Sequence, residues 1–252
     1  MIRTEQKGAA ATLVMSRPPV NAIDPAFVAA FNRALDDIEA ARPTAVVIRS
    51  DQKCFSAGAD LSLIRSFFDA PDGVEAMVAY VGTLHALFAR LEALEAVTLG
   101  AIDGPALGGG LELALCCDLR IASTRAKIGL PETRVGMIPG AGGTQRLTRL
   151  CGPGVSSRLI LGGEIVDGVE AARLGVVQWS AEARDFDARI GEITARVAGL
   201  SRPALVASKD CIAAWFDPHA DGYARELEKP RMLMKTKEAR TRIEGFFAAK
   251  AD

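Results

Sequence analysis

The chain has 252 residues, of which 49% are hydrophobic, and this length and composition fit one large domain or one domain with a small appendage and exclude a disordered protein. Thirty basic and thirty-one acidic residues leave a formal net charge of −1, which excludes a global field that would draw the chain to nucleic acid or to an anionic membrane surface.

The N-terminal segment, 1–19, carries charges at Arg3, Glu5 and Lys7, where a secretory signal peptide would need an uninterrupted apolar run. No later segment is expected to reach the roughly 18 apolar residues of a membrane span. We therefore expect a cytoplasmic protein with no membrane partner.

The cysteines and histidines give no sign of a metal or redox site. The five cysteines are an odd number without CxxC spacing, so buried free thiols are expected. Neither His85 nor His219 has a carboxylate or a cysteine at ligand spacing, so no metal site is expected. The cysteines are Cys54, Cys116, Cys117, Cys151 and Cys211.

The first predicted elements alternate between strand and helix. Residues 10–15 and 45–49 are short, β-branched-rich runs that predict strands. The amphipathic stretch 24–41 between them begins with Asp24 as a helix N-cap and Pro25 at the first helical position.

The middle of the chain continues this alternation. Apolar residues at three- and four-residue spacing predict a helix over 73–95, and 97–102 predicts a buried strand. A glycine-rich stretch and the apolar run LELALCC, a short helix, follow. Strands alternating with helices predict an α/β architecture.

From about residue 185 the pattern is helical throughout. The predicted helices are 185–199, 201–214, 220–231 and 236–249. We therefore expect an α/β core over 1–185 that carries the active site, and a helical C-terminal region over 186–252 that serves oligomerisation and pocket closure.

Three glycine-rich segments place small residues and carboxylates where a strand passes into a helix. In CFSAGADLSL, 54–63, Asp60 can cap the following helix, and the small residues before it leave backbone N–H groups open to an anion. In DGPALGGGLELALCCD, 103–118, three glycines expose amides immediately before Glu112. In GLPETRVGMIPGAGGTQRL, 129–147, a proline precedes Glu132 and a glycine-rich loop opens a helix.

Each segment alone has an ordinary structural interpretation. A glycine triplet occurs in common turns, and Glu112 by itself fits a solvated helix position as well as a catalytic one. Its neighbours Leu111 and Leu113 change this, because a carboxylate among apolar residues is either paired or functional. The nucleotide-binding patterns GxGxxG and GxxxxGK[ST] are not matched in the required context, and no GxSxG elbow surrounds Ser56.

Together the three segments resemble the crotonase (enoyl-CoA hydratase/isomerase) superfamily. Its pattern is an FxxGAD[LI] loop, a GxAxGGGxE loop and a PExxxGxxPGxGGxxRL segment, in this order and spacing. The similarity extends to PVNAI at 19–23, to LGGEIVDGVEAARLGVV at 161–177 and to the helix at 201–213, so it covers nearly the whole chain. It implies a spiral of ββα units with a helical C-terminal region, assembled as a homotrimer or homohexamer.

The resemblance also implies an activity and a set of site residues. The N–H groups of Ala59 and Gly109 would form an oxyanion hole for a thioester oxygen, while Glu112 and Glu132 would serve as the acid/base pair. The reaction would be hydration of a 2-trans-enoyl-CoA to a 3-hydroxyacyl-CoA, a step of fatty acid metabolism. Further substrate-binding residues would be Ala57, Gly58, Asp60, Leu61, Gly108, Pro131 and Gly140.

The chemistry requires such an arrangement. Negative charge develops on the carbonyl oxygen as an enolate forms, and one donor fixed at that oxygen is worth ~3 kcal/mol. Two carboxylates in a closed apolar pocket do not both ionise easily, which favours one charged and one protonated partner. We assign Glu112 as the base that activates water and Glu132 as the acid toward C2, and the opposite assignment stays open.

Coenzyme A is expected as part of the substrate, and no separate cofactor is expected. Many relatives carry a lysine where this chain has Ser62. Candidates for phosphate contacts are Lys53, Arg65 and Lys250, although a solvated surface charge is the simpler interpretation of each. The acyl pocket walls are expected from 62–80 and 212–232.

Other functions remain open at this stage. An isomerase would need one base and no positioned water, and hydrolases or carbon–carbon lyases of the superfamily share the thioester-enolate chemistry. A non-catalytic binding protein on the same scaffold, for instance one that binds RNA, is disfavoured because the charge is balanced and only 6% of residues are aromatic.

Overall fold

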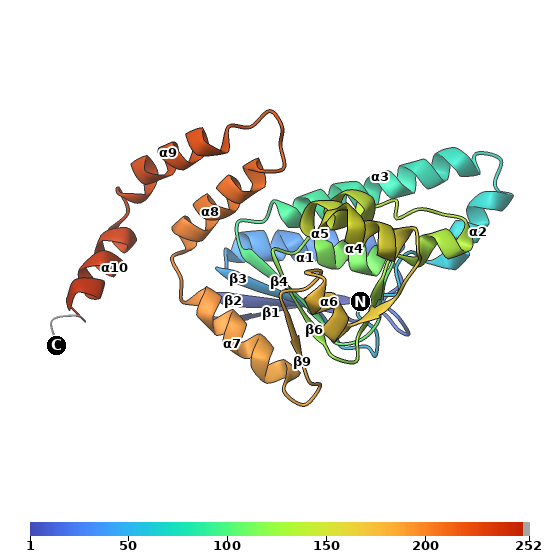
Figure 1. The fold of residues 1–252 in the computed structure, drawn as a ribbon, viewed down its shortest axis with the longest axis horizontal. Coiled ribbons are helices and arrows are strands. Elements are labelled where there is room, and N and C mark those ends of the chain that lie inside the picture. Colours follow the sequence, from blue (N-terminus) through green and yellow to red (C-terminus); the bar gives the residue numbers. More distant parts are fainter. Residues whose placement is uncertain (249–252) are drawn as a thin grey trace.

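The computed structural model describes residues 1–248 and is built around a twisted, mostly parallel sheet (Figure 1). Its strand order is β1-β2-β3-β4-β6-β9, with β1 antiparallel to β2 and the other neighbours parallel. The strands are β1 (Ile2–Lys7), β2 (Ala10–Met15), β3 (Ala45–Ser50), β4 (Val97–Ile102), β6 (Leu119–Ser123) and β9 (Trp179–Ala181). The three strands predicted at 10–15, 45–49 and 97–102 are confirmed.

A second, smaller sheet stands beside the first and has the order β5-β7-β8. It consists of β5 (Ala106–Leu107), β7 (Lys127–Gly129) and β8 (Val166–Asp167). The α/β architecture is confirmed, and β5 and β7 come directly before the two glutamate-bearing segments.

The helices cover both faces of the main sheet. Asp24 caps α1 as predicted, because its Oδ1 accepts a hydrogen bond of 2.7 Å from the Phe27 N–H. The helices up to the C-terminal region are α1 (Pro25–Ala41), α2 (Leu61–Asp69), α3 (Gly73–Glu92), α4 (Gly109–Leu115), the 3-10 helix η1 (Pro131–Val135), α5 (Gly143–Ile160) and α6 (Gly168–Arg173). Those that follow are α7 (Phe186–Ala198), α8 (Arg202–Ala214), α9 (Gly222–Leu233) and α10 (Lys237–Ala248).

The alternation of side chains along β3 explains why its sequence is almost uniformly apolar. Val46 and Ile48 point into the main core, which α1, α3, α4 and α5 share, whereas Val47 points to the opposite face. There it packs in a second cluster with Phe186 and Ile190 of α7. A parallel sheet covered on both faces needs strands that are apolar on both sides.

Helix α3 corrects one expectation from the sequence. It has 20 residues and, by length and composition alone, is long and apolar enough to cross a membrane. In the fold it buries Tyr80, Leu84, Leu87, Phe88 and Leu91 in the main core. The same apolar stripe that satisfies the membrane criterion therefore holds α3 against the body of the protein.

The C-terminal helices divide into two groups. Helix α7 packs on the sheet, whereas α8, α9 and α10 lead away from the body toward one end of the molecule (Figure 1). Lys209 of α8 anchors this arm, because its Nζ lies 2.8 Å from Asp118 Oδ2 at the start of β6. The proposed division into regions 1–185 and 186–252 stays a prediction.

The cysteines are free thiols, and three of the five are buried. Cys54, Cys116 and Cys117 lie in the interior, whereas Cys151 and Cys211 are half-buried. Burial raises the pKa of the Cys54 thiol to about 11 and that of Cys117 to about 12, so both stay protonated at neutral pH.

Candidate active site

The site begins at the edge of the sheet where β2, β3 and β4 end. Because these strands are parallel and adjacent, the loops that follow them meet at one edge. The loop after β3 contains 54–60, and the loop after β4 leads through β5 to α4. Bridges join Ser56 to Ala106 and Ile23 to Ala59, so the loops are held against one another.

Buried polar side chains fix these loops in place. Asn21 is fully buried, and its Nδ2 donates to Ser50 Oγ at 2.7 Å and to the Phe55 carbonyl at 3.0 Å. The hydroxyl of Ser56 donates to the Asn21 carbonyl at 2.8 Å and accepts from the Gly58 N–H at 3.1 Å. With these polar groups paired, the backbone around Gly58 is rigid.

The amides of Ala59 and Gly109 face the same space. A methyl group placed on Gly109 would lie 3.4 Å from the Ala59 nitrogen, and one on Gly58 would lie 2.9 Å from the Gly109 nitrogen. Within residues 1–248, neither of the two N–H groups donates a hydrogen bond to the protein. Two unpaired donors that line one cavity can bind an oxyanion.

Glu112 lies on α4, three residues after the first glycine of the helix. It is only 3% exposed, and its Oε1 accepts a hydrogen bond of 2.7 Å from the Gly143 N–H. Burial raises its pKa to about 7, the Gly143 and Ala141 amides oppose this rise, and the nearby charge of Glu132 adds to it. A carboxyl group of this kind can gain or lose a proton near neutral pH.

Glu132 lies on η1, and its environment differs from that of Glu112. Burial raises its pKa, and its Oε2 is buried without a hydrogen-bond partner among the described residues. Its Oε1 would lie 2.9 Å from a methyl group on Gly108, so the absence of a side chain there makes room for the carboxyl group. An unpaired buried carboxyl oxygen favours the neutral form of Glu132. At Glu112 the Gly143 N–H favours the ionised form, but burial outweighs this hydrogen bond and leaves the pKa raised.

One cavity of about 410 Å³ contains both glutamates and both amides. The sequence-predicted residues that line it are Ala57, Gly58, Ala59, Leu61, Gly108, Gly109, Glu112, Pro131, Glu132 and Gly140. Asp60 does not line it. Its Oδ1 instead accepts from the Ser62 N–H at 2.9 Å as the cap of α2, and its Oδ2 lies 3.8 Å from Arg17.

Part of the cavity wall comes from residues that sequence reasoning missed. Helix α3 contributes Val81 and Leu84, which lie beyond the expected wall 62–80 and whose spacing predicts a helix face but not what that face contacts. The expectation that 212–232 would form a wall is wrong, because in the described chain this segment lines a different cavity. The expected contribution of 62–80 is confirmed by Ile64, Arg65 and Phe68 among others.

The candidates for phosphate contacts are separated by the fold. Arg65 lies at the cavity, and Lys53 is exposed in the loop before Cys54. Lys250 lies outside the described residues.

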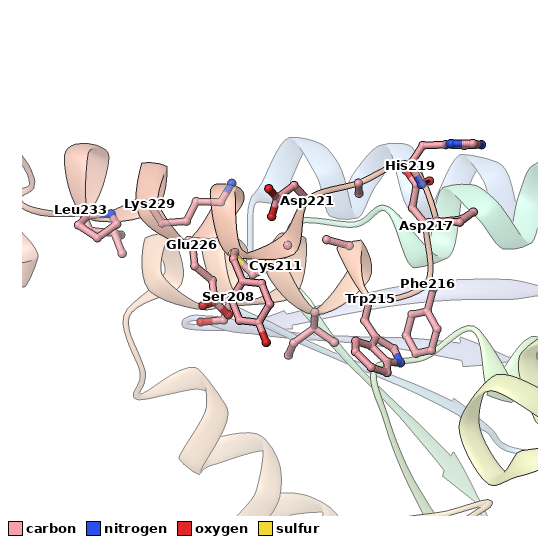
Figure 2. A pocket seen from close by; sticks show the side chains of 18 residues that line it. Ser208, Cys211, Trp215, Phe216, Asp217, His219, Asp221, Glu226, Lys229 and Leu233 are labelled. Carbon is pink, nitrogen blue, oxygen red and sulfur yellow. Dashed lines mark hydrogen bonds between the residues drawn. The ribbon is translucent and has the colours of Figure 1, made fainter.

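A second, larger cavity of about 1170 Å³ lies between α8, α9 and the segment that connects them (Figure 2). Trp215 and Phe216 border it at one end and Leu233 at the other. The predicted catalytic residues are all absent from its lining, so the chemistry expected from the sequence belongs to the smaller cavity.

Comparison with known proteins places the chain in a family. The fold and the cavity define an α/β protein in which two glutamates, one buried and one half-buried, line one cavity with two unpaired backbone amides. A model of the enoyl-CoA hydratase/isomerase family matches residues 5–249. The chain belongs to this family, within the crotonase superfamily.

Individual relatives carry the name of enoyl-CoA hydratase. The chain is 38% identical to a probable mitochondrial enoyl-CoA hydratase 2 of Arabidopsis thaliana over 90% of this chain and 74% of that protein. It is 32% identical to a short-chain-enoyl-CoA hydratase of Clostridium acetobutylicum, over 96% of each. A solved enoyl-CoA hydratase structure from Geobacillus kaustophilus superposes with a TM-score of 0.92 at 28% identity, over 98% of this chain and 94% of that one.

Proposed function

We propose that this chain hydrates 2-trans-enoyl-CoA thioesters to 3-hydroxyacyl-CoA thioesters. The observation that carries the proposal is the meeting of two unpaired amides with the buried Glu112 and the half-buried Glu132 in one cavity with largely apolar walls. Hydratase-named relatives at moderate identity over most of the chain support it.

The amides of Ala59 and Gly109 act on the thioester oxygen in this mechanism. Attack on C3 moves electrons toward that oxygen and generates an enolate. Donors that are already in place stabilise this charge without reorganising during the reaction, and one such donor is typically worth about 3 kcal/mol. The enclosing apolar walls strengthen the interaction by excluding water.

The glutamates transfer the protons. Glu112, whose carboxylate is supported by the Gly143 N–H, removes a proton from the attacking water. Glu132, whose buried unpaired oxygen favours the protonated form, delivers a proton to C2. Coenzyme A enters as the handle of the substrate and leaves with the product, and the mechanism uses no other cofactor.

An absorbance assay tests the proposal. Purified protein should deplete the conjugated-enoyl absorbance of 2-trans-enoyl-CoA substrates of increasing chain length, with a 3-hydroxyacyl-CoA as product. Appearance of a 3-enoyl-CoA without hydration would assign the chain to the isomerases of its family. Absence of turnover with all these thioesters, despite their binding, would contradict both a hydratase and an isomerase.

We also propose that α8, α9 and α10 form the contact between identical subunits in a homotrimer or homohexamer. Their exposed aromatic and apolar residues gather on an arm that extends from the body (Figure 1). Trp215 and Tyr223 are each 85% exposed and Leu227 is 75% exposed. An apolar patch of this kind on a surface marks a contact site.

Light scattering tests this assembly. The particle should have three or six times the chain mass of 26.6 kDa. Leu227→Asp should lower the mass toward that of one chain, whereas Val169→Asp, a change at an exposed valine of α6, should leave it unaltered. A monomeric wild-type protein would contradict the proposal.

A further inference from the structure

The loop between η1 and α5, 136–142, delivers the amide that holds Glu112. It contains Gly136, Gly140 and Gly142, and Gly143 follows at the first position of α5. Glycine permits many backbone conformations, so such a segment loses much conformational entropy when it is fixed. The 2.7 Å hydrogen bond from the Gly143 N–H to Glu112 therefore depends on other contacts that hold the loop.

Two side chains hold consecutive carbonyl groups of this loop. His85 Nε2 lies 2.8 Å from the Gly140 carbonyl oxygen, and Arg146 Nη1 donates to the Ala141 carbonyl oxygen at 2.8 Å. A carbonyl oxygen only accepts, so His85 carries a proton on Nε2 and donates it. The His85 contact lies three residues before the Gly143 amide, and the Arg146 contact lies two residues before it.

Both contacts lead back to α3. His85 is an exposed residue of that helix, and the Arg146 guanidinium is fixed by Glu92 of α3 through hydrogen bonds of 2.8 and 2.7 Å. The guanidinium also lies over the Phe88 ring, 5.9 Å from its centre. Helix α3 thus forms one wall of the cavity and also fixes the adjacent loop through His85 and Glu92.

We propose that His85 is a positioning residue, which holds the Gly140 carbonyl so that the Gly143 amide stays on the Glu112 carboxylate. The inference rests on the proposed hydratase function and assigns a role to a side chain outside the cavity. His85 touches neither glutamate and acts through the loop backbone alone. The Nε2–H group of His85 can donate to this carbonyl both in the neutral Nε2–H tautomer and in the imidazolium.

Kinetics of three variants test this role. His85→Ala should lower kcat for enoyl-CoA hydration about 3- to 10-fold, the size expected for one net hydrogen bond, with little change in KM. His85→Gln should restore most of the loss, because a glutamine amide can donate at a similar reach. Thr83→Ala is the control, since this exposed hydroxyl of α3 donates to the Tyr80 carbonyl of its own helix.

The pH profile separates positioning from a general loss of structure. Weakening the Gly143 N–H contact removes a donor that favours the ionised carboxylate, so the pKa of Glu112 should rise. The rising limb of kcat against pH should move to higher pH in His85→Ala and return toward its original place in His85→Gln. A uniform loss at all pH values without rescue would overturn the inference.

Hydrogen–deuterium exchange provides a readout that does not require turnover. In His85→Ala the amides of 140–143 should exchange about 3- to 10-fold faster than in the wild type, while those of β3 and β4 stay unchanged. Unaltered exchange in this loop would overturn the inference. If the wild type hydrates no thioester but the loop still responds to His85→Ala, the proposed function fails and the structural coupling stands.

Discussion

Replacing Glu112 by glutamine should lower kcat for enoyl-CoA hydration by about 10²- to 10⁴-fold, the range for loss of one positioned proton-transfer group. Glutamine keeps the shape of the side chain, and its carbonyl oxygen can still accept from the Gly143 N–H. It cannot remove a proton from water. Substrate binding, measured as KM or by titration with the product thioester, should change far less than kcat.

Two further variants show whether the loss is specific. Glu132→Gln should cost a comparable factor if both carboxyl groups transfer protons, while an isomerase would depend mainly on one of them. Glu75→Gln, at an exposed position in the first turn of α3, is the matched control and should retain wild-type kcat. Full activity in Glu112→Gln would contradict the proposed mechanism.

Glu112→Gln should also change how the free energy of unfolding depends on pH. The pKa of Glu112 is raised from 4.5 to about 7, so the folded protein binds this proton more tightly than the unfolded chain. The contribution to stability is complete below pH 4.5 and is lost as pH rises through about 7. At about 1.4 kcal/mol per pH unit, the free energy of unfolding should fall by up to about 3 kcal/mol across that window.

Denaturant unfolding between pH 4 and pH 8 measures this contribution. The decrease should be smaller in Glu112→Gln than in the wild type, because glutamine does not titrate. Carboxyl groups with a lowered pKa, such as Asp51 beside Arg3, also make stability depend on pH, but they do so at lower pH and increase stability as pH rises. Their contribution is the same in both proteins and cancels in the difference between them. Equal slopes would show that Glu112 is not held in a desolvated environment.

Local patterns in the sequence were sufficient for much of the fold. Asp24 followed by proline marked the start of α1, and apolar spacing marked α3 and β4 to within a few residues. These features depend on nearby residues, so periodicity and capping reveal them. Strand β1 went unrecognised because its burial alternates only weakly at an exposed edge of the sheet.

The candidate site was predictable where the chain itself carries the signal. Gly58, Gly108, Gly109 and the two glutamates stand in recognisable segments, and the structure brings them to one cavity, although their catalytic roles stay predictions. Contacts over long separations left no such signal. His85 and Gly140 are 55 residues apart, and only the packing of α3 beside the loop brings them together. The prediction that 212–232 lines the same cavity was wrong for the same reason, because the position of this segment depends on contacts between residues far apart in the sequence.

Gly58→Ala should remove most of the activity by moving the two proposed oxyanion donors apart, with a loss of about 10²-fold or more in kcat. Gly58 has a φ of +91°, and a methyl group there would lie 2.8 Å from the Leu107 carbonyl oxygen and 2.9 Å from the Gly109 nitrogen. These neighbours are backbone atoms of the segment that leads into α4. They cannot rotate away as a flexible side chain would, so one loop must shift.

A second glycine separates this steric effect from the cost of the left-handed backbone. Gly175 has a φ of +80°, and a methyl group on it would meet no atom within 4 Å. Alanine at either position should cost about 1–2 kcal/mol of stability for the conformation alone, which thermal unfolding of both variants can measure. Gly175→Ala should keep wild-type kcat. If Gly58→Ala folds and also keeps it, the Ala59 and Gly109 amides do not stabilise the transition state, because a displacement of either donor by even a few tenths of an ångström would weaken a hydrogen bond that forms fully only there.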